Sequence, residues 1–212
     1  MWDLGYNKMC GIAGILSKKN ENVAPLIGPM LSCIASRGPD GAGIAADNFV
    51  VQSDSPENVE YHRLYGSSVL GHLRLAIVGG TCGQQPFRSC DNRLTGEHNG
   101  EIYNYKQIRR KLLKHHKFDT LTDSEVIVHL LEDHFAKSND LISAIRKMVA
   151  ERDGGYALVV KDEVTGTIAL VRDKIGVRQL YYGENDSFVA FASERKALWK
   201  VGLKEPTKCV LP

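Results

Sequence analysis

The sequence predicts an α+β protein, with strands near both ends of the chain and helices in its middle. Short apolar runs bounded by turn residues lie near the N-terminus and again after residue 155. Between residues 105 and 149, apolar residues instead recur at helical spacing. The chain has 212 residues, enough for one large domain, and no internal repeat or linker divides it.

The N-terminal half is predicted to be mainly strands and turns. Residues 11–16 are apolar throughout, which indicates a short buried strand. Residues 23–36 favour a helix, although Pro25 and Pro29 weigh against its first half. We expect a turn at 37–41, strands at 49–52 and 69–78, and a turn at Asn99-Gly100.

The C-terminal half is predicted to begin with three helices, around 105–113, 122–131 and 141–149. Thr122 and Glu125 have capping-box spacing at the start of the second helix, and Asn104 is a candidate cap for the first. After the third helix, the spacing of apolar residues changes to the pattern typical of strands. We expect these strands at 156–160, 168–171, 179–182 and 188–192, followed by a helix at 193–199.

Composition excludes several classes of protein. The 43% hydrophobic and 25% charged residues are ordinary for a soluble globular chain, and a formal charge of +2 argues against nucleic-acid and membrane-surface partners. No stretch approaches the roughly 20 apolar residues of a membrane span, and Met1–Lys8 lacks the core of a signal peptide. The five cysteines include no CxxC pair. We therefore expect reduced thiols in a cytoplasmic protein, with neither a zinc site nor a disulfide framework.

Cys10 opens the first apolar run and has only nine residues before it. It has two interpretations, a buried small hydrophobe or the first residue of a mature chain. As a first residue it supplies both a thiol and an α-amine, whose ordinary pKa values lie near ~8.5 and ~8. A terminal nucleophile with its own amine as base is an established form of covalent catalysis. The residues of this segment alone leave both interpretations open.

Other candidate residues are also ambiguous when judged locally. Asn99-Gly100 is either a plain hairpin turn or a side-chain amide beside a free N–H, two donors able to stabilise an oxyanion. Arg74 interrupts an apolar strand and needs a partner, either a structural carboxylate or that of a ligand. Asp123 lies in the first turn of a predicted helix, where a carboxylate stabilises the macrodipole. Glu101 and His72 have no clear local interpretation.

Taken together, these segments resemble a family. Eight blocks occur in the order found in the class II glutamine amidotransferases, and the resemblance runs from Met9 to about Pro212. The blocks are residues 10–15, 37–41, 71–78, 85–87, 99–104, 122–126, 172–178 and 192–198. The resemblance implies the N-terminal-nucleophile hydrolase fold, a four-layer αββα sandwich of two antiparallel sheets between helices.

The resemblance also implies a reaction. Cys10 would attack the side-chain amide of L-glutamine, with its freed α-amine as the base. Asn99 and the Gly100 N–H would form the oxyanion hole. Ammonia would leave first, and water would then hydrolyse the γ-glutamyl thioester to glutamate. No metal or organic cofactor is implied for this step.

The resemblance assigns substrate-binding roles as well. Arg74 would hold the α-carboxylate of glutamine, and Asp123 and Glu101 would hold its α-ammonium. The backbone at Ile77 and Val78 would line the same pocket. An arginine at one end and carboxylates at the other suit a zwitterion.

Within this class, residues 99–104 and 74–78 look most like the glutaminase domain of asparagine synthetase. Residues 37–44 and 154–157 also look like phosphoribosyl amidotransferases, and glucosamine-phosphate or glutamate synthesis are further destinations for the ammonia. The sequence has no SGGxDS-type ATP pyrophosphatase loop. We expect a synthetase domain or subunit, in cis or in trans, to carry ATP and Mg²⁺. The sequence leaves a homodimer open.

The expected organisation is a leader or propeptide at residues 1–9 and a type 2 glutamine amidotransferase domain at 10–212. Removal of the leader would free the Cys10 α-amine. If Cys10 stays peptide-bonded, the base is missing. The chain would then be a catalytically silent glutamine-binding or interaction module. We expect the mature active protein to begin at Cys10.

Overall fold

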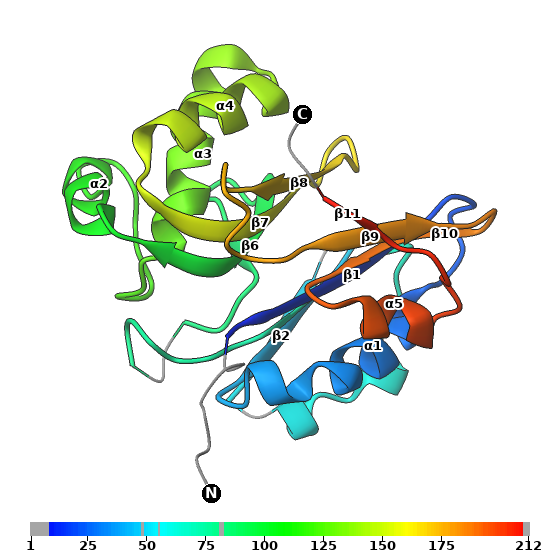
Figure 1. The fold of residues 1–212 in the computed structure, drawn as a ribbon. Coiled ribbons are helices and arrows are strands. Elements are labelled where there is room, and N and C mark those ends of the chain that lie inside the picture. Colours follow the sequence, from blue (N-terminus) through cyan, green and yellow to red (C-terminus); the bar gives the residue numbers. More distant parts are fainter. Residues whose placement is uncertain (1–8, 48, 55, 81–82, 210–212) are drawn as a thin grey trace, which may run out of the picture.

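The computed structural model describes residues 9–47, 49–54, 56–80 and 83–209, and within these ranges the chain forms two antiparallel sheets (Figure 1). The larger sheet has the order β11-β9-β10-β1-β4-β2-β3. Its strands in chain order are β1 (Gly11–Ser17), β2 (Ala42–Ala46), β3 (Phe49–Ser53), β4 (Ser68–Leu73), β9 (Tyr181–Glu184), β10 (Phe188–Ala192) and β11 (Thr207–Lys208).

The smaller sheet has the order β5-β6-β7-β8. Its strands are β5 (Phe87–Arg88), β6 (Leu94–Ile102), β7 (Gly154–Asp162) and β8 (Ile168–Arg172). The α-helices are α1 (Ile27–Cys33), α2 (Tyr105–Leu112), α3 (Glu125–Ser138), α4 (Leu141–Glu151) and α5 (Arg195–Lys200). No helix in the described part of the chain combines the length and apolarity needed to cross a membrane.

Three apolar clusters divide the molecule into four layers. One cluster joins the facing sides of the two sheets and includes Ile12 of β1, Phe191 of β10 and Val159 of β7. A second packs the larger sheet against α1 and α5, and a third packs the smaller sheet against α2, α3 and α4. Figure 1 shows the two groups of helices on opposite outer faces. The αββα sandwich that the sequence predicted is therefore confirmed.

Strand β1 shows how the sequence produces these layers. Successive side chains of a strand point to opposite faces, so Ile12 enters the cluster between the sheets while Ala13 and Ile15 pack toward α1 and α5. Gly14 shares the inner face with Ile12, and a Cβ there would lie 2.1 Å from Cζ of Phe191. The aromatic ring thus occupies the space above the glycine. This packing holds β1 between β10 and β4, with Cys10 just before its first residue.

Two of the strand and turn predictions were wrong. The strand expected over 69–78 ends at Leu73, because the next residues bond to the 40–41 turn: Arg74 N–H donates to Gly41 O and Ala76 N–H to Asp40 Oδ2. Asn99-Gly100 is not a hairpin turn. The dipeptide lies inside β6, where residues 99 and 100 pair with residues 157 and 156 of β7.

The helix predictions differ from the structure mainly at the ends. A 3₁₀ turn (Ala24–Leu26) precedes α1, and Pro29 is accommodated because it lies in the first turn of that helix. Asn104 does not cap α2; its side chain bonds to the backbone of Glu151 and Asp153 instead. At α3 only half of the expected capping box forms, with the Glu125 N–H donating to Thr122 Oγ1.

Candidate functional site

A pocket between the start of β1 and the end of β6 gathers the predicted site residues. Seven of the eight line it, namely Cys10, Arg74, Ile77, Val78, Gly100, Glu101 and Asp123. The eighth, Asn99, precedes Gly100 in β6 and is buried. Residues separated by more than a hundred positions in the chain thus meet where the two sheets adjoin.

The backbone at Cys10 is held from both sides of its peptide bond to Met9. Arg37 Nε donates to the Cys10 carbonyl oxygen at 3.0 Å, and the Met9 N–H donates to the Arg37 carbonyl at 3.1 Å. Arg37 is in turn paired with Glu194 at 3.1 Å. The ion pair of Arg37 thus links the 37–41 turn to a residue more than 150 positions away in the chain.

The Cys10 thiol contacts the backbone of Leu75, whose N–H donates to Sγ at 3.4 Å. Burial raises the pKa of this thiol, and the Leu75 N–H and the Arg74 guanidinium oppose that rise only in part. The thiol is therefore the resting form at neutral pH. Since the thiolate is the nucleophile, Cys10 needs a base that removes its proton as it attacks.

Strand β6 carries an unpartnered donor next to Gly100, which lines the pocket together with Cys10. Asn99 is 1% exposed, and its Nδ2 has no hydrogen-bond partner among the described residues. Leaving such a donor unpaired costs about 1–3 kcal/mol, which a ligand oxygen would recover. Gly100 has φ +153°, and a Cβ there would lie 2.2 Å from the Gly155 carbonyl oxygen. The close pairing of β6 with β7 therefore requires glycine at this position.

Arg74 lines the pocket while being only 3% exposed. Its Nη2 donates to the carbonyls of Val78 at 3.2 Å and Gly80 at 2.7 Å, so its partners in the protein are carbonyls. Its Nη1 is buried without a partner in the described part of the chain. The structural-carboxylate interpretation of Arg74 is therefore wrong, and one edge of the guanidinium is left for an anionic ligand group.

Asp123 lies two residues before α3, just ahead of the first turn in which the sequence placed it. Its Oδ2 accepts the N–H of Ile102 at 2.9 Å, which fixes the carboxylate against β6. Burial raises the pKa of Asp123, and the neighbouring Glu101 carboxylate raises it further. A cationic ligand group between these two carboxylates would relieve that repulsion.

The sequence profile that describes the glutamine amidotransferase domain matches residues 9–208. The chain belongs to this family. It is 38% identical over 193 residues to the "Putative asparagine synthetase (glutamine-hydrolyzing) 1" of Methanocaldococcus jannaschii, covering 90% of this chain and 33% of that protein. It is also 34% identical over 204 residues to an amidophosphoribosyltransferase of the same organism, covering 90% of this chain and 43% of that protein.

A solved structure agrees with these similarities. The glutamine phosphoribosylpyrophosphate amidotransferase from B. subtilis, complexed with ADP and GMP, superposes with a TM-score of 0.76 at 28% identity. The match covers 94% of this chain and 44% of that one. The amidotransferase domain described here thus spans less than half the length of these relatives.

Local sequence reasoning missed one residue that shapes the amidotransferase pocket. Gln85 lines the pocket, and its side chain bonds twice to the backbone of His98: Oε1 accepts the N–H at 2.6 Å and Nε2 donates to the carbonyl at 3.0 Å. This pairing holds β6 immediately before Asn99. The Gln85-Pro86-Phe87 block of the family resemblance was the only sequence signal for it.

His72, which the sequence left ambiguous, is buried outside the pocket. Its Nε2 lies 3.1 Å from the His98 carbonyl, and His98 Nδ1 lies 2.8 Å from Ser124 Oγ. Burial lowers the pKa of His72 to about 3, and burial also holds the pKa of His98 well below its usual range. Both imidazoles are therefore neutral links between β4, β6 and the segment before α3.

Proposed function

We propose that this amidotransferase domain hydrolyses L-glutamine to glutamate and ammonia through a γ-glutamyl thioester on Cys10. Membership of the family supports the activity. The observation that carries the assignment of residues is the pocket itself. Cys10 and Arg74, with its buried, unpartnered Nη1, line it, and Asn99, with its unpartnered Nδ2, directly precedes the lining residue Gly100.

In the proposed reaction the freed α-amine of Cys10 takes the proton from Sγ as the sulfur attacks the amide carbon of glutamine. The Asn99 amide and the Gly100 N–H stabilise the oxyanion that forms. The protonated amine then gives its proton to the leaving nitrogen, which departs as ammonia. Water, with the amine again as base, attacks the thioester and releases glutamate from Sγ.

Charge complementarity supports the proposed orientation of the substrate. Arg74 Nη1 binds the α-carboxylate, and Asp123 with Glu101 binds the α-ammonium. The backbone at Ile77 and Val78 lines the wall between them. The neutral side-chain amide is thereby directed to Cys10. No metal or organic cofactor takes part in this reaction.

Activity is proposed to require removal of the leader, residues 1–9. Residues 1–8 lie outside the described part of the structure, whereas Met9 lies within it, bonded to Cys10. N-terminal mass spectrometry should accompany a glutaminase assay, because only chains beginning at Cys10 carry the amine base. Full-rate hydrolysis by chains that still begin at Met1 would rule out the free-amine mechanism. The alternative, a silent glutamine-binding module, predicts glutamine binding without ammonia release.

The nucleophile has a separate test. Cys10→Ala should abolish ammonia production while Cys33→Ser, on the outer helix α1, should leave it unchanged. Persistent hydrolysis by the alanine variant would refute the assignment of Cys10. Isotope-labelled glutamine followed by rapid acid quench should show a covalent adduct on Cys10 in the active protein only.

We further propose asparagine synthesis as the destination of the ammonia, supported by the 38% identity to the putative asparagine synthetase of M. jannaschii. The amidophosphoribosyltransferase match supports phosphoribosyl transfer as the second candidate. ATP and Mg²⁺ would belong to the partner synthetase. The free cysteines at 10, 33, 90 and 209 suit a reducing cytoplasm. Ammonia-dependent amide formation with each candidate synthetase, added as a separate chain, distinguishes the two.

A further inference from the structure

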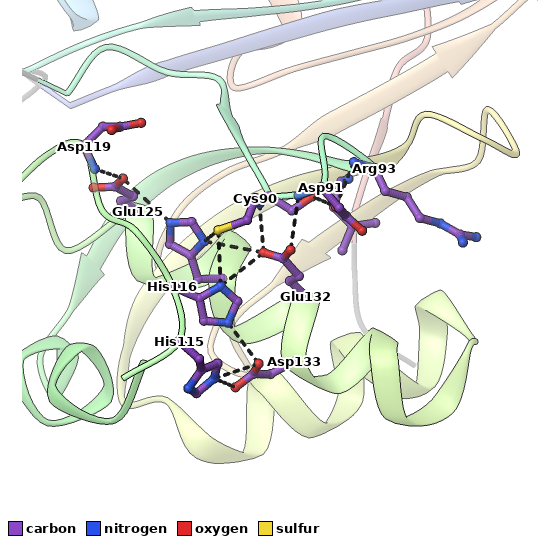
Figure 2. Close-up of polar contacts among 12 residues, drawn as sticks. Cys90, Asp91, Arg93, His115, His116, Asp119, Glu125, Glu132 and Asp133 are labelled. Atoms are coloured by element: carbon purple, nitrogen blue, oxygen red, sulfur yellow. Dashed lines mark hydrogen bonds and ion pairs between the residues drawn. The ribbon is translucent and has the colours of Figure 1, made fainter. Parts of the chain in front are cut away.

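A second cluster of chemically active side chains, none of which lines the pocket at Cys10, joins helix α3 to two neighbouring loops (Figure 2). Cys90 comes from the turn between β5 and β6, and His116 from the connection between α2 and α3. His129 and Glu132 lie one turn apart on α3. One ligand atom from each of these four residues lies within 4.8 Å of the others.

Four of the six distances among these atoms have the length of tetrahedron edges around a small cation, and the other two are below 4.8 Å. Cys90 Sγ lies 3.4 Å from His116 Nδ1 and 3.6 Å from His129 Nδ1. Glu132 Oε2 lies 3.3 Å from His116 Nδ1 and 3.6 Å from His129 Nδ1. With metal bonds of about 2.3 Å to sulfur and about 2.0 Å to nitrogen or oxygen, tetrahedral zinc has edges of about 3.3–3.6 Å.

The outer nitrogens of both histidines face carboxylates. His116 Nε2 lies 2.9 Å from Asp133 Oδ1, and His129 Nε2 lies 3.8 Å from Glu125 Oε1. Such partners hold the proton on Nε2 and leave the Nδ1 lone pair free for a metal. In this cluster, therefore, both Nδ1 lone pairs are directed toward the shared centre.

With both imidazoles neutral, a purely hydrogen-bonded network leaves acceptor atoms facing one another. A neutral His116 that donates from Nε2 has an acceptor at Nδ1, yet Nδ1 faces the Glu132 carboxylate at 3.3 Å. His129 Nδ1 meets the same oxygen at 3.6 Å. Cys90 has one S–H proton, which it can donate to only one of these acceptor atoms. A cation at the centre satisfies all of them at once.

Charge and burial also fit a divalent cation. A Cys90 thiolate and the Glu132 carboxylate together carry −2, which one divalent ion neutralises. The side chains of His116 and His129 are only 6% and 4% exposed, whereas Cys90 is exposed and gives access from solvent. Glu132 also accepts the backbone N–H groups of Cys90 and Asp91, which shapes the turn around the centre.

We propose that Cys90, His116, His129 and Glu132 form a structural Zn²⁺ site. The mixed sulfur, nitrogen and oxygen set of four ligands, with edge distances that fit a tetrahedron, favours zinc over harder cations. Binding releases the Cys90 proton to solvent and forms four bonds to the metal, with no change of oxidation state. The ion joins three segments that are far apart in sequence, the β5–β6 turn, the α2–α3 connection and helix α3. The absence of CxxC pairs did not exclude this site, because it uses a single cysteine.

The test is the zinc content of the whole purified chain, measured by elemental mass spectrometry. We expect about one zinc per chain in the wild type and in Cys33→Ser, and none in Cys90→Ser. Cys33 is the matched control because it lies on α1, in the opposite helical layer. A zinc-free wild type that also fails to take up added zinc overturns the proposal, as does equal zinc in the two serine variants.

A second measurement does not depend on the folding of a variant. The chelated wild-type chain is reloaded with Co²⁺, and its visible spectrum is recorded. Tetrahedral d–d bands with a thiolate-to-cobalt charge-transfer band support the site. A spectrum of octahedral, sulfur-free cobalt overturns it. Chelation should also lower the melting temperature of the wild type, and an unchanged melting temperature counts against a structural role.

Discussion

Arg37 Nε donates a hydrogen bond to the carbonyl oxygen of Cys10 at 3.0 Å, and the carbonyl of Arg37 accepts the N–H of Met9. The guanidinium is itself held by Glu194 and is 5% exposed. Arg37 therefore holds the backbone of the proposed nucleophile and does not line the pocket at Cys10. It acts as a positioning residue between η2 (Ala35–Arg37) and the start of β1.

Replacing Arg37 by methionine should lower kcat about tenfold or more and leave KM nearly unchanged. The reason is that a hydrogen bond to a charged group contributes about 1.5–3 kcal/mol, here toward the position of Cys10 rather than toward glutamine binding. Steady-state glutaminase kinetics on chains that begin at Cys10 make the comparison. Lys196→Met, which removes another partner of Glu194 at 2.9 Å, is the control and should keep the wild-type kcat. A rise in KM alone would contradict the positioning role.

Asn99 and Arg74 should have opposite kinetic signatures. Asn99→Ala removes the donor that we propose stabilises the oxyanion, so kcat should fall about 10²–10³-fold with little change in KM. Arg74→Met removes the proposed contact to the α-carboxylate, which would be present in ground and transition states alike, so KM should rise. Equal effects of both variants on KM would show that Asn99 binds ground-state substrate instead.

The periodicity of the sequence was sufficient to predict most helices and strands. Apolar spacing placed helices near α2, α3 and α4, because each buries one stripe against the smaller sheet. It failed at 74–78, where the backbone bonds to the distant 40–41 turn. It failed again at Asn99-Gly100, because strand pairing with β7 overrides the turn tendency of the dipeptide.

The sites depended on information that local patterns do not contain. Cys10, Arg74, Gly100 and Asp123 come from four separate segments, so only the ordered resemblance to a family linked them before the structure did. The Cys90 cluster belongs to no such pattern. Its only regular spacing is the three residues from His129 to Glu132, which is common on any helix.

Gly100→Ala should destabilise the fold far more than Gly96→Ala in the same strand. A Cβ at residue 100 would lie 2.2 Å from the Gly155 carbonyl, whereas at residue 96 the nearest atom is 3.9 Å away. We expect the first change to lower the free energy of unfolding by about 1–3 kcal/mol and the second to have little effect. Denaturant titration of both variants makes the comparison. Equal losses would contradict the close approach of β6 and β7.

The stability of the domain should fall as the pH is lowered from neutrality toward 4, in part because of His72. Its folded-state pKa of about 3 lies below the unfolded value of 6.5. Above pH 6.5 both states are neutral, so the stabilisation is fully present there. Below that pH the unfolded chain takes up a proton that the folded chain does not. The free energy of unfolding should therefore fall by about 1.4 kcal/mol per pH unit for such a histidine.

His72→Gln isolates this contribution, because glutamine retains a donor for the His98 carbonyl but does not titrate. Any loss of stability of the variant at pH 7 is a constant offset, so the informative quantity is the slope between pH 6 and pH 4. Urea titrations across that interval should give a shallower slope for the variant, by about 1.4 kcal/mol per pH unit. Parallel slopes in wild type and variant would mean that His72 takes up its proton in the folded state, and that the buried link between β4 and β6 tolerates charge.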